Sequence, residues 1–382
     1  MRIVFIVGFL TILFVFSSNF IMSSEHFALA KPHKFHKKHF SENVDKILDK
    51  INKHKKQIKL QENKKEIKPQ ENKKQIKPQE NFITKDYNFA AEGDKKRKDF
   101  NFAAVGDFGC SKNAKKTVNN MEDKKPELVL PLGDLSYDKT AKCWLDLISP
   151  FSDKLKVTLG FHDVNDGGSK LQQYEKTFGL DKLYGSFDYR HVHFVTMASE
   201  SKFDKGSAQF KFIDKDLKKA SENKDIEWII VATYGPFYTS PSTHKAEKGL
   251  RDIYHPLFEK YNVDLVLQAH NHNYQRTYPI SYNSAGDSSE PTVKNQLTTG
   301  YNSHTGGTVF AIVGTGGESF YPLNSQSAYV ASQFGKFGFL NIDISNGNPH
   351  TKLTGTFYDN KGGDVKDQFT IEKEIKSKKV VG

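Results

Sequence analysis

The sequence is poor in cysteine, with only two among 382 residues, and its hydrophobic content of 37% is too low for a polytopic membrane protein. The composition also excludes collagen and coiled-coil arrays. Residues 99–382 lack a net charge, since they hold 34 Lys and Arg against 34 Asp and Glu. The basic excess lies in residues 31–98, with 21 Lys and Arg against 10 Asp and Glu. A folded nucleic-acid-binding domain is therefore not indicated, and we expect no specific nucleic-acid partner.

Residues 1–30 have the pattern of an export signal. Arg2 precedes an apolar run over residues 3–16, and Ala28-Leu29-Ala30 fits an A-x-A cleavage site. Counting on to residue 22 gives about 20 mostly apolar residues, enough to span a bilayer as an uncleaved anchor. We favour cleavage and keep the anchor as the alternative. In both cases we expect the remaining chain to lie outside the cytoplasm, secreted or anchored at the cell surface.

The expected location outside the cytoplasm affects the redox state of the two cysteines, Cys110 and Cys143. Because thiols tend to oxidise outside the cytoplasm, we expect a disulfide between them. The alternative is two unrelated buried thiols. A bridge would tie the loop after Asp107 to the helix after Tyr137.

Residues 31–98 have the composition of a disordered tether. They contain three consecutive copies of a nine-residue polar unit, Lys55–Asn63, Lys64–Asn72 and Lys73–Asn81. A unit with one Ile buries too little apolar area to offset chain entropy, so we expect a solvated spacer. The alternative is that the lysines engage an anionic cell-surface polymer or membrane.

An alternation of strand-like and helix-like segments predicts one α/β domain over residues 99–382, with two β layers between helices. Sites in such sheets gather at the carboxyl ends of the strands. Strands are expected at 102–105, 128–132, 157–159, 228–232, 263–267, 309–313, 338–344 and 351–358, and helices at 111–121, 207–220 and 248–261.

Five side chains near these strand ends are candidate metal ligands. Asp107 and Asp134 each follow a glycine at the end of a buried strand, where a carboxylate is costly without a cation. Tyr137 lies three residues further on, and His270 and His272 are placed at i and i+2 of a segment expected to be extended. Together they offer oxygen and nitrogen donors suited to Fe, Mn or Zn.

Five segments resemble, in order, the conserved blocks of the calcineurin-like metallophosphoesterases, and the tyrosine of the second block resembles the purple acid phosphatase branch. The segments are GDFG (106–109), GDLSYD (133–138), GFHD (160–163), YGPFYTS (234–240) and AHNHNYQRTYP (269–279). The resemblance implies a two-sheet β-sandwich flanked by helices in four layers. It also implies a dinuclear metal centre at which a metal-bound hydroxide attacks a phosphate ester.

The resemblance assigns roles to the candidate ligands. Asp107, Tyr137 and His272 would bind the first metal, and the phenolate of Tyr137 points to iron there. Asp134 would bridge the two metals. His270 would bind the second metal, which could be Zn, Mn or Fe.

The same resemblance implies three residues that act on substrate. His162 would protonate the leaving alkoxide or bind phosphate, and Asp163 would orient it. His244 resembles a substrate-contacting histidine, and an ordinary exposed loop histidine is an equally good interpretation. Gly314–Gly317 is expected to form a tight turn near the metals, because it is too short for a dinucleotide loop.

Two positions depart from the family pattern. Phe161 stands where the third block has an asparagine ligand, and Tyr234 stands where the fourth block has a histidine. The second metal is therefore expected to be weakly held or absent.

Three functional hypotheses follow. The favoured one is an exported, acid phosphatase-like enzyme that hydrolyses a phosphate ester. The second is a degenerate surface protein that binds a metal or a phosphate ligand without turnover. The third is a structural or cell-surface binding module that uses its tether. The sequence indicates neither the ester nor the oligomeric state.

Overall fold

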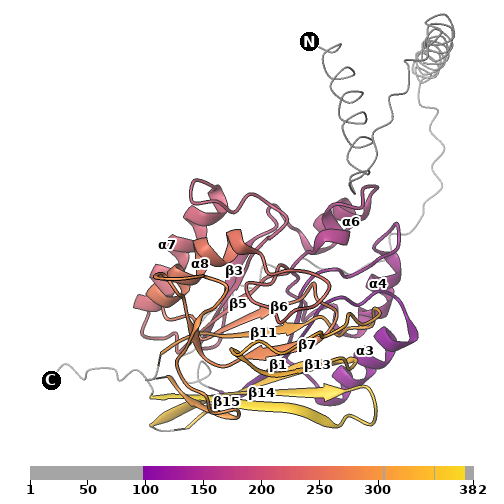
Figure 1. The fold of residues 1–382 in the computed structure, drawn as a ribbon. Coiled ribbons are helices and arrows are strands. Elements are labelled where there is room, and N and C mark those ends of the chain that lie inside the picture. The colour runs from indigo at the N-terminus through magenta and orange to yellow at the C-terminus, as the bar shows by residue number, and fades with distance from the viewer. Residues whose placement is uncertain (1–97, 304–305, 348, 375–382) are drawn as a thin grey trace, which may run out of the picture. The chain divides into compact units, whose positions relative to one another are not determined.

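The computed structural model describes residues 98–303, 306–347 and 349–374. The expected export signal, nearly all of the tether and its repeats lie outside these residues. Two main sheets face each other, and helices flank them (Figure 1). This arrangement confirms the expected α/β class. Within the described ranges, no helix is both long and apolar enough to cross a membrane.

The first sheet has six strands in the order β10-β15-β14-β13-β1-β2. β1 pairs in parallel with β2 and antiparallel with β13, so the carboxyl ends of β1 and β2 lie at the same edge. The strands are β1 (Phe100–Val105), β2 (Leu128–Pro131), β10 (Gly300–Asn302), β13 (Gly338–Asn346), β14 (His350–Asp359) and β15 (Val365–Glu374).

The second sheet has seven strands in the order β12-β7-β11-β6-β5-β4-β3. β4, β5, β6 and β11 are parallel, and their carboxyl ends also lie at one edge. The strands are β3 (Gly185–Tyr189), β4 (Val192–Thr196), β5 (Trp228–Ala232), β6 (Leu265–Gln268), β7 (Tyr274–Thr277), β11 (Val309–Val313) and β12 (Val330–Phe334). A small separate ribbon pairs β8 (Ile280–Ser281) with β9 (Thr292–Val293).

Two of the described helices begin at a serine whose side chain caps them. Ser111 accepts hydrogen bonds from the backbone at the start of α3, and Ser207 does the same for α7. The helices are α3 (Lys112–Lys124), α4 (Lys142–Leu147), α5 (Phe161–Val164), α6 (Lys170–Phe178), α7 (Ala208–Glu222) and α8 (Lys248–Lys260), with a 3₁₀ turn η2 (Ser149–Phe151).

Two apolar clusters hold the layers together. The larger one lies between the sheets, where the rings of Phe102 and Phe194 meet edge to face with centroids 5.3 Å apart. The second lies between the seven-stranded sheet and the helices α7 and α8. On the other side, α3 packs against β13. These contacts fix the two strand edges relative to each other.

The expected strand at 157–159 is wrong as a regular strand. Residues from Leu155 to Thr158 run beside β2 but pair with it only through isolated bridges. β2 ends at Pro131, which has no N–H to donate, so the ladder of hydrogen bonds cannot continue on that side. The other expected strands and helices are present, with ends shifted by up to three residues.

Cys110 and Cys143 form a disulfide, with their Cα atoms 6.1 Å apart. Cys110 lies in the loop after β1, and Cys143 lies in α4, which follows the loop after β2. The bridge therefore joins the loop that carries Asp107 to the helix that follows the loop of Tyr137.

His193 on β4 makes folding stability depend on pH. Burial alone would lower its pKa, but hydrogen bonds to Asp188 (2.6 Å) and Asp216 (2.9 Å) raise it to about 9. A pKa raised above the unfolded value stabilises the fold below about pH 6.5, and this contribution is lost as the pH rises to 9. We expect His193→Gln to lower the free energy of unfolding by about 2 kcal/mol at pH 6 and by much less at pH 9.5.

Denaturant unfolding at the two pH values measures this difference. His350→Gln is the matched control, because the His350 side chain is exposed and lies 3.7 Å from Glu372. An equal loss of stability by His193→Gln at both pH values would contradict the prediction.

Candidate metal centre

Three of the candidate ligands lie in strained backbone at strand ends. Asp107 follows β1, Asp134 follows β2, and His270 follows β6, with φ angles of 55°, 48° and 73°. Residues with side chains rarely adopt positive φ, and such strain tends to gather at functional sites. Among the described residues only six non-glycine positions have positive φ, and half of them are these ligands.

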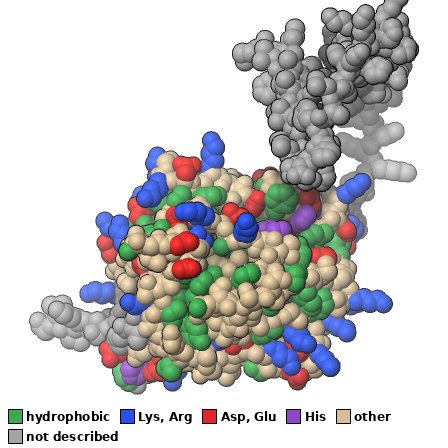
Figure 2. All heavy atoms as spheres, viewed as in Figure 1, with side chains coloured by type: hydrophobic (Ala, Val, Ile, Leu, Met, Phe, Trp, Pro, Cys, Tyr) green, Lys and Arg blue, Asp and Glu red, His purple; other side chains and the backbone are tan. Residues whose placement is uncertain are grey.

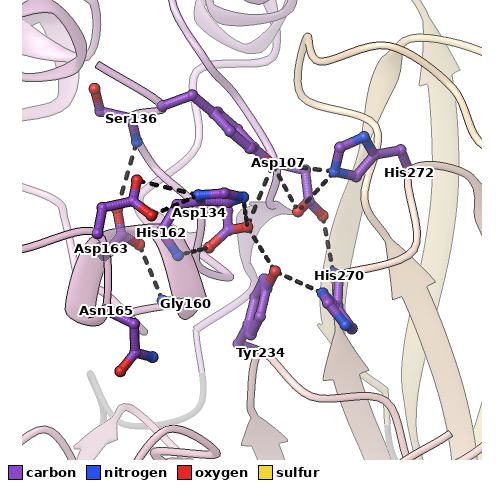
Figure 3. A network of polar contacts seen from close by, with 12 residues as sticks. Asp107, Asp134, Ser136, Gly160, His162, Asp163, Asn165, Tyr234, His270 and His272 are labelled. Carbon is purple, nitrogen blue, oxygen red and sulfur yellow. Dashed lines mark hydrogen bonds and ion pairs between the residues drawn. The ribbon is translucent and has the colours of Figure 1, made fainter. Parts of the chain in front are cut away.

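The first group of ligands converges on the hydroxyl of Tyr137. Figure 3 shows its other members, Asp107, Asp134 and His272, with their side chains turned toward one another. This oxygen lies 3.2 Å from Asp107 Oδ1, 3.3 Å from Asp134 Oδ2 and 3.0 Å from His272 Nε2. A phenol has one proton and can satisfy only one of these acceptors. The four side chains therefore bring more lone-pair-bearing oxygen and nitrogen atoms to one point than a single phenol proton can satisfy. Such atoms are potential metal ligands.

His272 is oriented by its other ring nitrogen. Nδ1–H donates to the backbone carbonyl of Ser319 at 2.7 Å, which directs Nε2 at Asp107 and Tyr137. The Tyr321 ring stacks on the imidazole, with centroids 4.0 Å apart. A backbone carbonyl that fixes the tautomer in this way is typical of histidines that bind metals.

The second group contains Asp134, Tyr234 and His270. The Tyr234 hydroxyl lies 2.5 Å from Asp134 Oδ2 and 2.6 Å from His270 Nδ1. Phe161 adds no donor atom, and its side chain is 47% exposed. The second group thus offers three donors where the first offers four, and Asp134 belongs to both.

Tyr234 is accommodated by two glycines. A Cβ on Gly133 or on Gly160 would lie 2.7 Å from Cδ2 of the Tyr234 ring. A side chain at either position would clash with the tyrosine, and at Gly160 its Cβ would also collide with the backbone nitrogen of Asp134. The backbone around the fourth block therefore has room for Tyr234 in place of the family's histidine.

Asp163 differs from its expected role. Its buried carboxylate accepts hydrogen bonds from the backbone N–H groups of Leu135, Ser136 and Gly160, and among the residues that the structure describes none of its hydrogen bonds involves the His162 ring. It clamps the loop after β2 to the start of α5. The partner of His162 is Asp166, which accepts from Nδ1 at 2.9 Å.

Sequence reasoning missed Asp166 because it assigned the adjacent carboxylate of the family motif. The spacing could have identified it, since i and i+4 side chains meet on a helical turn. His162 Nε2 points the other way, 3.9 Å from Asp134 Oδ2.

His244 lies at the site and is not a remote loop residue. Its ring stacks on His270, with centroids 3.9 Å apart. Asn271, between the two histidines of the fifth block, accepts from the His244 N–H and donates to its carbonyl. The turn at Gly314–Gly317 packs against the Asp107 loop, where Gly316 N–H donates to Gly106 and Gly317 N–H to Asp107.

Burial and crowded negative charge shift the ionisation of the site. Burial and the nearby Asp107 raise the pKa of Asp134 to about 7. Burial, together with the charges of Asp107 and Asp134, raises the pKa values of Tyr137 and Tyr234 far above the usual range. Both phenols are therefore protonated when no cation is bound. Burial and His244 lower the pKa of His270 to about 4. Neutral imidazole beside crowded carboxylates is suited to a cation.

The site opens to solvent on one side. Figure 2 shows histidine side chains at the upper edge of the molecule, with apolar side chains beside them. The His162 side chain is 37% exposed, in contrast to the buried Asp134 that it faces. A ligand can therefore reach His162 from solvent while the carboxylates stay covered.

Comparison with known families agrees with this geometry. Residues 100–274 match the model of the calcineurin-like phosphoesterase family, a range that includes every candidate ligand. This part of the chain is a calcineurin-like phosphoesterase domain. Among curated proteins, purple acid phosphatase 22 of Arabidopsis thaliana is 28% identical over 204 residues, covering 48% of this chain and 46% of that protein.

Purple acid phosphatase 1 of Ipomoea batatas is 26% identical over 275 residues, covering 63% of this chain and 55% of that protein. The chain spans about half the length of the curated relatives that it matches.

Solved structures show the same fold. A purple acid phosphatase from yellow lupin seeds superposes with a TM-score of 0.62 and 22% identity, covering 73% of this chain and 54% of that one. GAP50, described as the anchor in the inner membrane complex of Plasmodium, gives a TM-score of 0.54 and 18% identity, covering 74% and 90%.

The phosphoesterase family implies a dinuclear metal centre, and the residues present fit its two positions unequally. The first position has the convergent oxygens and nitrogen of Asp107, Asp134, Tyr137 and His272. The second has Asp134, Tyr234 and His270, where a protonated phenol replaces a histidine and no donor replaces the asparagine. The first position has all four side chains that the family pattern assigns to it, and the second lacks two of its expected ligands.

The raised pKa of Asp134 makes metal binding dependent on pH. Below a pKa of about 7 the carboxyl is protonated in the metal-free protein, so a metal must displace the proton. We expect the apparent metal affinity to fall by about tenfold or more for each pH unit below 7, because the Asp134 proton is displaced in addition to any proton that the Tyr137 phenol loses. Calorimetric titrations at pH 5.5, 6.5 and 7.5 measure this. A constant affinity, without proton release, would contradict the prediction.

Proposed function

We propose that the chain is an exported, metal-dependent phosphoesterase that hydrolyses phosphate esters, with its catalytic domain in residues 99–382. The observation that carries this proposal is the convergence of Asp107, Asp134 and His272 on the Tyr137 hydroxyl. Support for export comes from the signal-like residues 1–30 and from the disulfide between Cys110 and Cys143.

Each group at the site has a task in this proposal. Bound metals would activate water and neutralise charge on the phosphoryl group, with iron held by Tyr137 at the first position. His162, exposed at the rim, would protonate the leaving alkoxide. His244, stacked on His270, would contact the phosphate ester. Asp163 would hold the loops of Asp134 and His162 in register through its backbone hydrogen bonds.

The experiment is hydrolysis of an aryl phosphate by the purified protein, stripped of metal and then supplied with Fe, Zn or Mn. We expect no hydrolysis after the metal is removed, and recovery of hydrolysis when at least one of these metals is added. Equal activity before and after stripping would argue against a metal-dependent enzyme.

A second function is favoured by one observation. Phe161 carries no donor atom and is largely exposed, so the second metal position lacks a ligand. The chain could then be a surface protein that binds one metal or a phosphate-bearing ligand without turnover, held by the Lys-rich residues 31–98 on an anionic polymer or membrane. Binding of metal and inorganic phosphate, with no hydrolysis under any metal, would favour this function.

A further inference from the structure

On the Nδ1 side of its ring, His162 contacts a pair of charged residues, Asp166 and Lys170. Its Nδ1–H donates to both carboxylate oxygens of Asp166, at 2.9 and 3.1 Å. Lys170 then donates to Asp166 Oδ2 at 3.0 Å and to the backbone carbonyl of Ser136 at 2.7 Å. The chain of contacts therefore runs from the loop of Tyr137, through Lys170 and Asp166, to the imidazole.

Lys170 is an unusual residue in this position. It is completely buried, although lysine side chains almost always keep their ammonium in water. A buried charge costs several kcal/mol unless it is well paired, and an apolar side chain of similar size is often as stable or more so. Stability alone therefore does not explain an ammonium here.

The local backbone is shaped to bring these two residues together. α5 ends at Val164 and α6 begins at Lys170, and the turn between them contains Gly167 and Gly168 with φ angles of 76° and 74°. A Cβ on Gly167 would meet nothing within 4 Å, so its positive φ, and not crowding, is the reason for glycine. The turn returns the chain so that Lys170 reaches Asp166.

The other side of the imidazole faces the metal ligands. His162 Nε2 lies 3.9 Å from Asp134 Oδ2 (Figure 3). The ring also packs on Tyr137, with centroids 4.5 Å apart. The backbone N–H of His162 also donates to Asp134 Oδ1 at 2.8 Å. With Nδ1–H bound to Asp166, only Nε2 is available to a ligand.

We propose that Asp166 and Lys170 are positioning residues that hold His162 with Nδ1–H on Asp166 and Nε2 directed at the leaving group of the ester. This rests on the proposed function. The step uses the imidazolium form of His162, which carries a proton on each ring nitrogen. As hydroxide adds to phosphorus and the P–O bond to the leaving group breaks, the electron pair of that bond stays on the leaving oxygen and the Nε2 proton passes to it. The Nδ1 proton stays on the imidazole, hydrogen-bonded to Asp166.

The first test compares Asp166→Asn with the natural protein on two esters. An alkyl phosphate has a poor leaving group that needs a proton, whereas 4-nitrophenyl phosphate has a good one. We expect kcat to fall about 10–100-fold on the alkyl ester and less than about threefold on the aryl ester, with KM nearly unchanged. Equal losses on both esters, or no loss, would overturn the proposal.

The matched control is Asp146→Asn. Asp146 forms an i,i+4 pair with Lys142, as Asp166 does with Lys170, but both side chains of that pair are exposed. It should change neither rate. If Asp166→Asn does not fold, the double variant Asp166→Asn, Lys170→Met removes both partners of the buried pair and takes its place.

The second test does not depend on turnover. Nitrogen-15 NMR of the histidine rings, with His162→Gln used to assign the signals, reports which ring nitrogen carries the proton. At a pH where the ring is neutral, we expect the proton on Nδ1 alone in the natural protein and a mixture of the two tautomers in Asp166→Asn. Unchanged His162 signals would overturn the proposal even if the enzyme is active. Inactive natural protein with a fixed, Asp166-dependent tautomer would instead count against the proposed function alone.

Discussion

Replacing Asp134 by Asn is expected to lower phosphoesterase activity by well over 100-fold and to weaken binding at both metal positions. Loss of a residue that merely orients a ligand costs about 10–100-fold, and a ligand shared by both positions should cost more. Asp134 approaches both groups, at 3.3 Å from Tyr137 and 2.5 Å from Tyr234. Asparagine keeps the size and one oxygen, so the fold should survive.

Two measurements accompany this variant. Thermal unfolding should show a melting temperature close to that of the natural protein, and metal analysis should show depleted metal. Asp146→Asn serves again as the control, because the Asp146 side chain is 64% exposed and pairs only with Lys142 among the described ion pairs. Full activity in Asp134→Asn would mean that the hydrolytic site lies elsewhere.

The second large expected effect is an increase in activity. Changing Phe161 to Asn and Tyr234 to His together should strengthen binding of the second metal and raise kcat/KM by about 10–100-fold. The exchange adds an amide oxygen and an imidazole nitrogen to a position that now has a protonated phenol. Phe161 is 47% exposed, so its replacement opens no cavity in the core.

Each single variant helps to interpret the double one. Phe161→Asn alone tests the missing amide, and Tyr234→His alone tests whether the phenol already acts as a ligand. Steady-state kinetics with a titration of the second metal measures both. Unchanged metal affinity and unchanged kcat/KM in the double variant would show that these two positions do not limit the natural site.

Much of this site could be predicted from order and spacing alone. Asp107, Asp134 and the His270–His272 pair follow strands whose apolar runs are clear in the sequence, and parallel strands bring their carboxyl ends to one edge. The disulfide partners needed no choice, because there are only two cysteines. The local sequence pattern was sufficient to predict a site residue when its position depends only on one strand and the turn that follows it.

The rest depended on contacts between distant segments. The pair His270–His272 does not lie on an extended segment, because its backbone is bent by the φ of 73° at His270. The two imidazoles therefore face different groups, Tyr234 and Tyr137. β15 was not expected from its charged sequence, since only alternate residues of this strand face the core.

The side chains behind the site were also hidden from the sequence. No expected helix or strand included Lys170, and the turn at Gly167 and Gly168 brings its ammonium to Asp166. The backbone hydrogen bonds of Asp163 could not be distinguished from a hydrogen bond to His162 by spacing. Tertiary packing, and not local preference, assigned these roles.

The most direct test of the metal centre is anomalous X-ray diffraction from crystals of the protein soaked in Fe or Zn, recorded at the absorption edge of the metal. We expect a strong peak within bonding distance of Asp107, Asp134, Tyr137 and His272, with a weaker peak or none beside Tyr234 and His270. A stronger peak at the second position, or no peak at the first, would contradict this expectation.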